Sequence, residues 1–165
     1  MSDNQELSAK GWRLFAHPLF IEQVEALIRD VEVLRIKYPD SYKSKNATKR
    51  LAAINDLIWD VIPEDPTHPK YRQGGTLGKV HKHWYRAKFF QQYRLSFRYH
   101  SANHVIVYGW VNDTKTKRAY GHKNGAYSVF EKMLNSGHPP TGWDELLAAC
   151  RSAGSRLSEL MTDDS

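Results

Sequence analysis

The sequence predicts an α+β fold in which an amino-terminal helical hairpin packs on a small, mainly antiparallel β-sheet, with helices at the carboxy-terminal end. Three observations support this prediction. Apolar residues recur at helical spacing over residues 18–61, strand-like runs occupy residues 84–111, and helical spacing returns after residue 126. A chain of 165 residues with 41% hydrophobic and 25% charged residues is typical of a soluble domain, so we expect a single domain over residues 1–165.

Two helices should form the amino-terminal hairpin. Pro18 suits the first turn of a helix, and Pro39 ends the apolar pattern that follows it. Asp40 or Ser41 can cap a second helix, which Pro63 should stop. The short connection makes the two helices antiparallel, and we expect the pair to cover one face of the sheet.

Three segments lack such periodicity. Residues 1–10 and about 154–165 are polar and should be loose tails, while residues 63–83 should form a long loop rich in Pro, Gly, His and Lys. Gly74 to Gly78 resembles a phosphate-binding loop only superficially, because the Lys-Ser/Thr ending is missing. The chain has no signal-peptide pattern and no apolar run of membrane-spanning length, so we expect a cytoplasmic protein that contacts no membrane.

Three strands should span residues 84–90, 92–99 and 104–111. The third run is nearly all apolar, as in a central strand that is covered on both faces. Alternation in the second run places aromatic and apolar residues on one face and Arg94 and Arg98 on the other. We therefore expect an aromatic face for packing and a cationic face that is turned to water.

The carboxy-terminal region should contribute two more helices. The first contains Tyr127 and ends at Gly137, and Thr141 with Asp144 can cap the second. Cys150 is the single cysteine, which excludes an internal disulfide. Its place in an apolar run predicts a small buried hydrophobic residue rather than a nucleophile.

Positive charge is concentrated in residues 79–123. This segment holds ten Lys and Arg residues and one acid, a local net charge of +9 (10 − 1) against +6 for the whole chain. Such a field favours nucleic acid, an acidic protein or anionic lipid as partner, and a solvated basic surface is the plainer alternative. The ten basic residues are Lys79, Lys82, Arg86, Lys88, Arg94, Arg98, Lys115, Lys117, Arg118 and Lys123.

Metal-dependent chemistry and carboxylate-pair chemistry fit this composition poorly. His81 and His83 lack an acid or cysteine at ligand spacing, and their surroundings are cationic, so we expect neither a metal ion nor a cofactor. Arg, Lys, Tyr and His suit RNA cleavage by attack of a ribose 2′-hydroxyl on the adjacent phosphate, in which cations stabilise the phosphorane. A non-catalytic RNA- or DNA-binding sheet would use the same residue types, and composition does not choose between these two functions.

Several phrases of the sequence resemble a known family of toxins. Residues 85–99, followed by residues 104–111 and a basic loop, resemble the core of RelE-superfamily toxins. More closely, residues 11–143 resemble the YhaV toxins of PrlF–YhaV type II toxin–antitoxin systems. The shared phrases include Gly109-Trp-Val-Asn-Asp and Gly137-His-Pro-Pro, and together they cover about four-fifths of the chain.

This resemblance implies a RelE-like α/β fold and an endoribonuclease (an mRNA interferase) that cleaves mRNA, on or off the ribosome, and so arrests translation and growth. It also implies neutralisation by a PrlF-type antitoxin with a swapped-hairpin DNA-binding domain, and binding of operator DNA through the toxin–antitoxin complex. The alternative is a non-catalytic nucleic-acid-binding module that acts with its partner as a transcriptional regulator.

Candidate site residues follow from the same resemblance. Arg94 and Arg118 would bind and stabilise the scissile phosphate. Arg86 and Lys88 would position the backbone, and one of them could help to deprotonate the 2′-hydroxyl.

The site tyrosine would stack a base or move a proton, and both Tyr120 and Tyr127 match its position. Further phosphate contacts are expected from basic residues around this centre. The catalytic candidates are therefore Arg86, Lys88, Arg94, Arg118, Tyr120 and Tyr127, and the candidates for RNA binding are Lys79, His83, Arg98 and Lys117.

Overall fold

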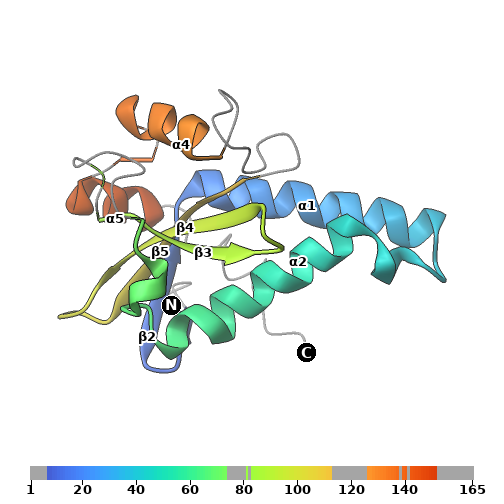
Figure 1. Cartoon of the computed structure of the whole chain (residues 1–165), viewed down its shortest axis with the longest axis horizontal. Coiled ribbons are helices and arrows are strands. Elements are labelled where there is room, and N and C mark those ends of the chain that lie inside the picture. Colours follow the sequence, from blue (N-terminus) through green and yellow to red (C-terminus); the bar gives the residue numbers. More distant parts are fainter. Residues whose placement is uncertain are drawn as a thin grey trace, which may run out of the picture.

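The structure is a computed structural model, and it describes residues 7–73, 81, 83–112, 126–137, 139–140 and 142–151. These residues form five strands and several helical segments (Figure 1). In chain order the elements are β1 (Leu7–Ala9), β2 (Trp12–Ala16), α1 (Pro18–Lys37), the 3₁₀ turn η1 (Tyr42–Ser44), α2 (Asn46–Asp56), the π-helical turn η2 (Leu57–Val61), α3 (Ile62–Glu64), the 3₁₀ turn η3 (Pro69–Tyr71), β3 (Tyr85–Phe89), β4 (Tyr93–His100), β5 (Val105–Val111), α4 (Ala126–Asn135) and α5 (Trp143–Arg151).

The strands form one mixed sheet in the order β1-β2-β5-β4-β3. β2 pairs in parallel with β5, and the other three strand pairs are antiparallel. All of β5 is buried, as expected of a strand that has a neighbour on each side and a layer on each face. The predicted α+β fold with a mainly antiparallel sheet is therefore confirmed, as are the three strands between residues 84 and 111.

The first two strands correct the prediction of a loose tail over residues 1–10. Residues 7–9 form β1, which pairs with β2 through a tight turn at Lys10 and Gly11, where φ is 52° and 86°. β2 was not predicted at all. Its parallel partner β5 lies about ninety residues further along the chain, and local periodicity carries no information on pairing at that distance.

The helical hairpin is confirmed, with corrections at both ends of its second helix. α1 begins at Pro18 as predicted, and the His17 side chain caps it by accepting a hydrogen bond from the Leu19 N–H at 3.1 Å. α2 begins at Asn46 rather than at residues 40–41, because the turn η1 intervenes. The chain stays helical to Glu64, since the π-helical register of η2 brings Pro63 into the first turn of α3, where a missing N–H costs least. In Figure 1 the hairpin extends well beyond the sheet.

Each face of the sheet has its own hydrophobic core. The core under α1 and α2 contains Phe20, Phe97 and Tyr108, and the Tyr108 hydroxyl donates to the Ile58 carbonyl at 2.8 Å. The second core joins Trp84 and Trp110 to residues of α4 and α5. Each core contains several of the large, fully buried aromatic side chains, so both layers stabilise the sheet.

The second layer confirms two predictions about the carboxy-terminal region. α4 ends before Gly137, which has φ of 86° and donates its N–H to the Leu134 carbonyl at 3.0 Å. Cys150 is 1% exposed, and burial raises the pKa of its thiol to about 12. Thr141, the expected cap of α5, lies outside the described residues. None of the described helices combines the length and apolar composition that crossing a membrane requires.

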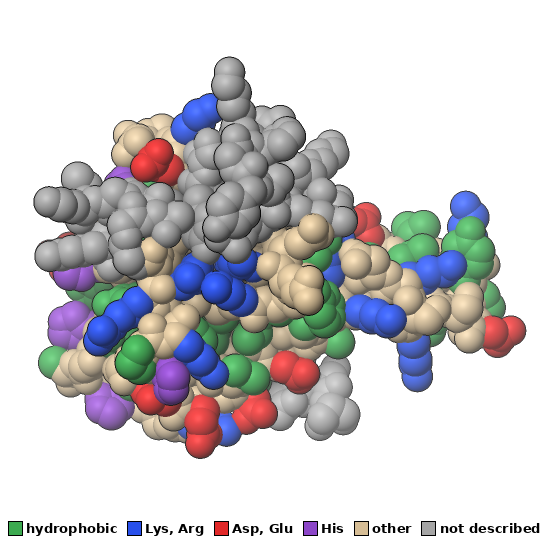
Figure 2. Space-filling model, viewed as in Figure 1, with side chains coloured by type: hydrophobic (Ala, Val, Ile, Leu, Met, Phe, Trp, Pro, Cys, Tyr) green, Lys and Arg blue, Asp and Glu red, His purple; other side chains and the backbone are tan. Residues whose placement is uncertain are grey.

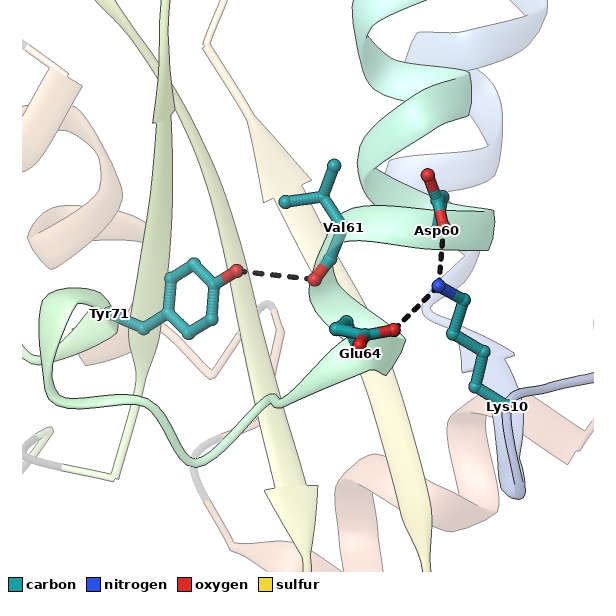
Figure 3. A network of polar contacts seen from close by, with 5 residues as sticks. All are labelled: Lys10, Asp60, Val61, Glu64 and Tyr71. Carbon is teal, nitrogen blue, oxygen red and sulfur yellow. Dashed lines mark hydrogen bonds and ion pairs between the residues drawn. The ribbon is translucent and has the colours of Figure 1, made fainter.

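A polar network fastens the β1–β2 turn to the end of the helical hairpin (Figure 3). Lys10 Nζ lies 2.5 Å from Asp60 Oδ1 and 2.6 Å from Glu64 Oε2. The hydrogen bonds to Asp60 and Glu64 raise the pKa of Lys10. Close by, the Tyr71 hydroxyl donates to the Val61 carbonyl at 3.4 Å. The Lys10, Asp60 and Glu64 side chains are largely exposed, so these ion pairs fix orientation more than they stabilise the fold.

Gly109 should resist substitution because Trp84 fills the space beside it. The β4–β5 register shifts at this point, so Gly109 is the extra residue of a β-bulge. A Cβ atom there would lie 2.4 Å from Trp84 Cζ3 and 2.5 Å from Cη2. We expect Gly109→Ala to lower the free energy of unfolding by about 1–3 kcal/mol, as overpacking of a core does, measured by urea denaturation.

Gly142→Ala is the matched control. Its Cβ would meet Glu145 Oε2 at 1.8 Å, but that atom ends a flexible, exposed side chain that can turn away. Equal unfolding free energies for the two variants would contradict the packing constraint at Gly109.

Candidate nucleic-acid interface

Three of the expected site residues come together on neighbouring strands. On β3 and β4, Lys88 pairs directly with Arg94, and Arg86 pairs with Ser96. Lys88 is exposed and Arg86 is half-buried. Figure 2 shows Lys and Arg side chains gathered near the centre of the view, over the β3–β4 hairpin. Opposed like charges repel across a strand pair, so an anion bound beside them would be favourable.

Arg94 and Ser96 correct the expectation that this face is turned to water. They are 2% and 3% exposed. Arg94 Nη1 donates to the carbonyl oxygens of Gln91 at 2.7 Å and Tyr93 at 2.9 Å. The alternation of β4 was correct, but the helices α4 and α5 form a second core on the face that it assigned to solvent. The Arg94 guanidinium therefore helps to hold the β3–β4 connection.

Two amide side chains fix the end of β5, and the sequence did not single them out. Asn112 Oδ1 accepts the backbone N–H of Arg94 at 2.6 Å, and its Nδ2 donates to the Gln92 carbonyl at 3.0 Å. On the other side, the Gln23 amide donates to the Val111 carbonyl at 2.6 Å and accepts the Val111 N–H at 3.1 Å. The one available signal was an Asn directly after a buried strand, which is too common to be specific.

Arg98, an expected RNA contact, lies between two indole rings. Its guanidinium carbon is 5.9 Å from the ring centroid of Trp84 and 5.4 Å from that of Trp143. The His100 ring stacks on Trp143 at 5.4 Å, and burial lowers the pKa of Arg98. This placement favours a role for Arg98 in joining α5 to the sheet through cation–π contacts.

The remaining expected site residues are placed less completely. His83 is exposed just before β3, and the Arg86 guanidinium donates to the Arg72 carbonyl. Tyr127 lies on α4, but its side chain is not among those described. The other four, which lie outside the described residues, are Lys79, Lys117, Arg118 and Tyr120.

Among the described residues, no three His, Cys, Asp or Glu side chains lie together in a way that could hold a metal ion. The buried His81 pairs instead with an amide, its Nε2 lying 2.9 Å from Asn135 Oδ1. The described part of the site thus offers cations, aromatic rings and carbonyl-bound guanidinium groups, which is a set suited to binding phosphate.

Comparison with known proteins identifies the family. The sequence profile described as a toxin with endonuclease activity, of toxin–antitoxin systems, matches residues 14–151. The chain belongs to the YhaV toxin family. It is 47% identical over 138 residues to Toxin YhaV of Escherichia coli O6:H1 and to Ribonuclease toxin YhaV of Escherichia coli K12, covering 82% of this chain and 90% of each relative. No solved structure matches the chain significantly.

Because the chain belongs to the YhaV toxin family, its class of activity and one of its partners are known. It is a toxin with endonuclease activity, and a toxin–antitoxin system supplies an antitoxin that binds it. The resemblance seen in the sequence is therefore confirmed. The match begins at residue 14, inside β2, and ends in α5, so it includes the hairpin α1–α2 and both faces of the sheet.

Asn112 should matter for stability because its buried amide satisfies two backbone groups of the β3–β4 hairpin. Asn112→Ala leaves the Arg94 N–H and the Gln92 carbonyl without this partner, which should cost about 1–3 kcal/mol of unfolding free energy. Urea denaturation measures the loss, and faster hydrogen exchange at the Arg94 amide would locate it. Asn103→Ala, in the exposed β4–β5 turn, is the control and should change little. Equal effects of the two substitutions would contradict the proposed junction.

Proposed function

We propose that this YhaV-family toxin cleaves mRNA without a metal ion, by attack of a ribose 2′-hydroxyl on the adjacent phosphate, and thereby inhibits translation and growth. The observation that carries the proposal is the Lys88–Arg94 pair, which sets two cations opposite one another on a strand pair. The name of the Escherichia coli K12 relative, Ribonuclease toxin YhaV, supports RNA as the substrate.

The reaction needs charge stabilisation and proton transfer, and these residue types supply both. In the proposed mechanism, exposed Lys88 binds the scissile phosphate and stabilises the charge that builds up on the phosphorane. Arg86, anchored on the Arg72 carbonyl, positions the RNA backbone. Arg94 adds positive potential at the site. Its hydrogen bonds to the Gln91 and Tyr93 carbonyls also hold the β3–β4 hairpin in place, so its role is structural as well as electrostatic.

The other catalytic roles are proposed from the family resemblance. Arg118 would be a second phosphate-binding cation from the segment that follows β5. Tyr120 or Tyr127 would stack a base or move a proton to the leaving 5′-oxygen. Lys88 or Arg86 would assist removal of the 2′-hydroxyl proton.

The finer details of fold and partners are part of the same proposal. We infer a RelE-like arrangement of the sheet and a cytoplasmic site of action on mRNA, on or off the ribosome. The antitoxin would be of the PrlF type, with a swapped-hairpin DNA-binding domain that brings the complex to operator DNA. Local net charge of +9 in residues 79–123 supports an RNA substrate and an acidic antitoxin segment as competing ligands.

An RNA cleavage assay tests the reaction directly. Purified toxin is incubated with end-labelled RNA, with and without ribosomes and with and without EDTA. We expect cleavage that EDTA does not reduce, with 2′,3′-cyclic phosphate ends, because the 2′-oxygen is the nucleophile. Loss of cleavage in EDTA would refute metal independence. RNA that is bound but intact in every condition would instead support a non-catalytic regulator.

Substitution of Lys88 tests the site with little risk to the fold. Because Lys88 is exposed, Lys88→Ala should leave the melting temperature unchanged while lowering the cleavage rate about 100-fold, the usual cost of removing one stabilising donor. Lys49→Ala, an equally exposed lysine on α2, is the control and should cleave normally. Wild-type cleavage by Lys88→Ala would exclude this residue from the site.

A further inference from the structure

The connection between β3 and β4 has an unusual backbone. Phe90 has φ of 48° and Gln91 has φ of 62°, so two consecutive residues with large side chains adopt the left-handed region. Glycine, asparagine and aspartate are the residues that adopt it readily, and turns of this kind strongly prefer them. An aromatic residue in this conformation is strained, and strain that persists at one point is often linked to function.

Surrounding contacts impose this conformation. The strand pair closes at Phe89 and Tyr93, immediately on either side of the connection. Within it, the Gln92 N–H donates to the Phe90 carbonyl at 2.6 Å, and Arg94 Nη1 donates to the Gln91 carbonyl at 2.7 Å. Asn112 binds the Gln92 carbonyl from the end of β5. The carbonyl groups of Phe90, Gln91 and Gln92 thus each accept a hydrogen bond, and these bonds keep the backbone of the connection rigid.

The strain is not compensated by burial of the aromatic ring. Phe90 is 50% exposed, whereas its neighbour Phe89 is 9% exposed. Phe89 stacks on Tyr93 at 5.3 Å as part of the core, and the half-exposed Phe90 ring meets Phe89 edge-on, at 5.6 Å between centroids. Of the exposed large hydrophobic residues in the described part of the chain, Phe90 alone lies between two strands, and the others lie on or after α1 and in η2.

The chemistry around Phe90 indicates what would cover the ring. Lys88, two residues earlier, and Arg94, four residues later, form the cross-strand pair of the proposed site. The exposed Phe90 ring and the exposed Lys88 belong to the same hairpin end. Aromatic rings and cations together are the combination by which proteins bind single-stranded RNA, the ring stacking on a splayed base while the cations hold the backbone. A rigid support favours this role, because little conformational entropy is lost on binding.

We propose that Phe90 forms a base-stacking subsite for the substrate RNA, on the hairpin that carries the phosphate-binding residues. The inference rests on the proposed function, because its ligand is the RNA that the toxin would cleave. It adds a specific contact to that function: one nucleobase on the Phe90 ring, in an RNA strand whose backbone Lys88 also binds.

Phe90→Asn separates stacking from a purely structural role. Asparagine tolerates the left-handed backbone better than phenylalanine, so the variant should melt at the same or a higher temperature. It cannot stack a base well, so we expect its affinity for RNA to fall about tenfold, the usual effect of removing one stacking ring. Phe90→Tyr keeps the ring and should retain wild-type affinity. Binding is measured by fluorescence anisotropy on a labelled 2′-O-methyl RNA, which lacks the nucleophilic hydroxyl and stays intact.

Ile36→Asn is the matched control, since Ile36 is 80% exposed on α1, away from the sheet. It should bind RNA as the wild type does. Wild-type affinity in Phe90→Asn would overturn the inference. A loss of affinity that accompanies a fall in melting temperature would also overturn it, because it would assign Phe90 to packing.

A second measurement uses the unmodified protein and does not depend on how any variant folds. RNA that carries 5-iodouridine crosslinks on irradiation to an aromatic ring stacked on that base. We expect the peptide that contains Phe90 to be crosslinked, and crosslinks confined to other peptides would overturn the inference. Wild-type protein that cleaves RNA while Phe90→Asn binds normally would refute only the subsite. Wild-type protein that neither binds nor cleaves RNA would refute the proposed function itself.

Discussion

The amide of Asn112 joins the central strand of the sheet to the hairpin that carries the cationic residues. One of its atoms accepts the Arg94 N–H and another donates to the Gln92 carbonyl, so the end of β5 and the β3–β4 connection are fixed relative to each other. Gln23 does the same for β5 from the side of α1, by pairing with both backbone groups of Val111. Hydrogen bonds from a buried or part-buried amide to backbone groups are costly to break, which makes this junction a rigid base for a site.

The rest of the sheet is built so that this junction stays in place. β5 is buried along its whole length, between β2 and β4 and between two helical layers. Its bulge at Gly109 gives room to the Trp84 indole, which in turn meets Phe130 of α4 edge-on at 5.3 Å. On the same face, Arg98 connects Trp84 to Trp143 of α5. The close packing of aromatic rings therefore links both carboxy-terminal helices to the strands that bear the site.

The burial of each cationic residue indicates whether its role is structural or lies in the proposed site. Arg94 is enclosed, and its guanidinium group is tolerated there because carbonyl oxygens accept its hydrogen bonds. Lys88, directly opposite, is exposed to solvent. Phe90 lies between them in the chain, strained and half-exposed. In the proposed function, a stable sheet supports a strained, partly exposed edge that RNA would cover.

Much of the secondary structure could be predicted from sequence because it depends on neighbours in the chain. Pro18 begins a helix through its fixed φ, Gly137 follows one through its positive φ, and apolar runs gave the three strands β3, β4 and β5. The pairing of Lys88 with Arg94 also follows from a short hairpin, whose register depends on the turn alone. Burial of Cys150 was predicted correctly from its apolar surroundings.

Tertiary structure decided what each face of those elements meets. A period of two shows that Arg94 and Arg98 share a face, but only packing of α4 and α5 makes that face a core in which one binds carbonyls and the other contacts two indoles. The parallel pairing of β2 with β5 and the role of Asn112 depend on segments that are distant in sequence. The sequence by itself therefore determined the local elements and their cationic character, because these depend on backbone preference and residue type. Which charges are enclosed and which are left for a ligand depends on contacts between distant segments, and only the folded chain decides it.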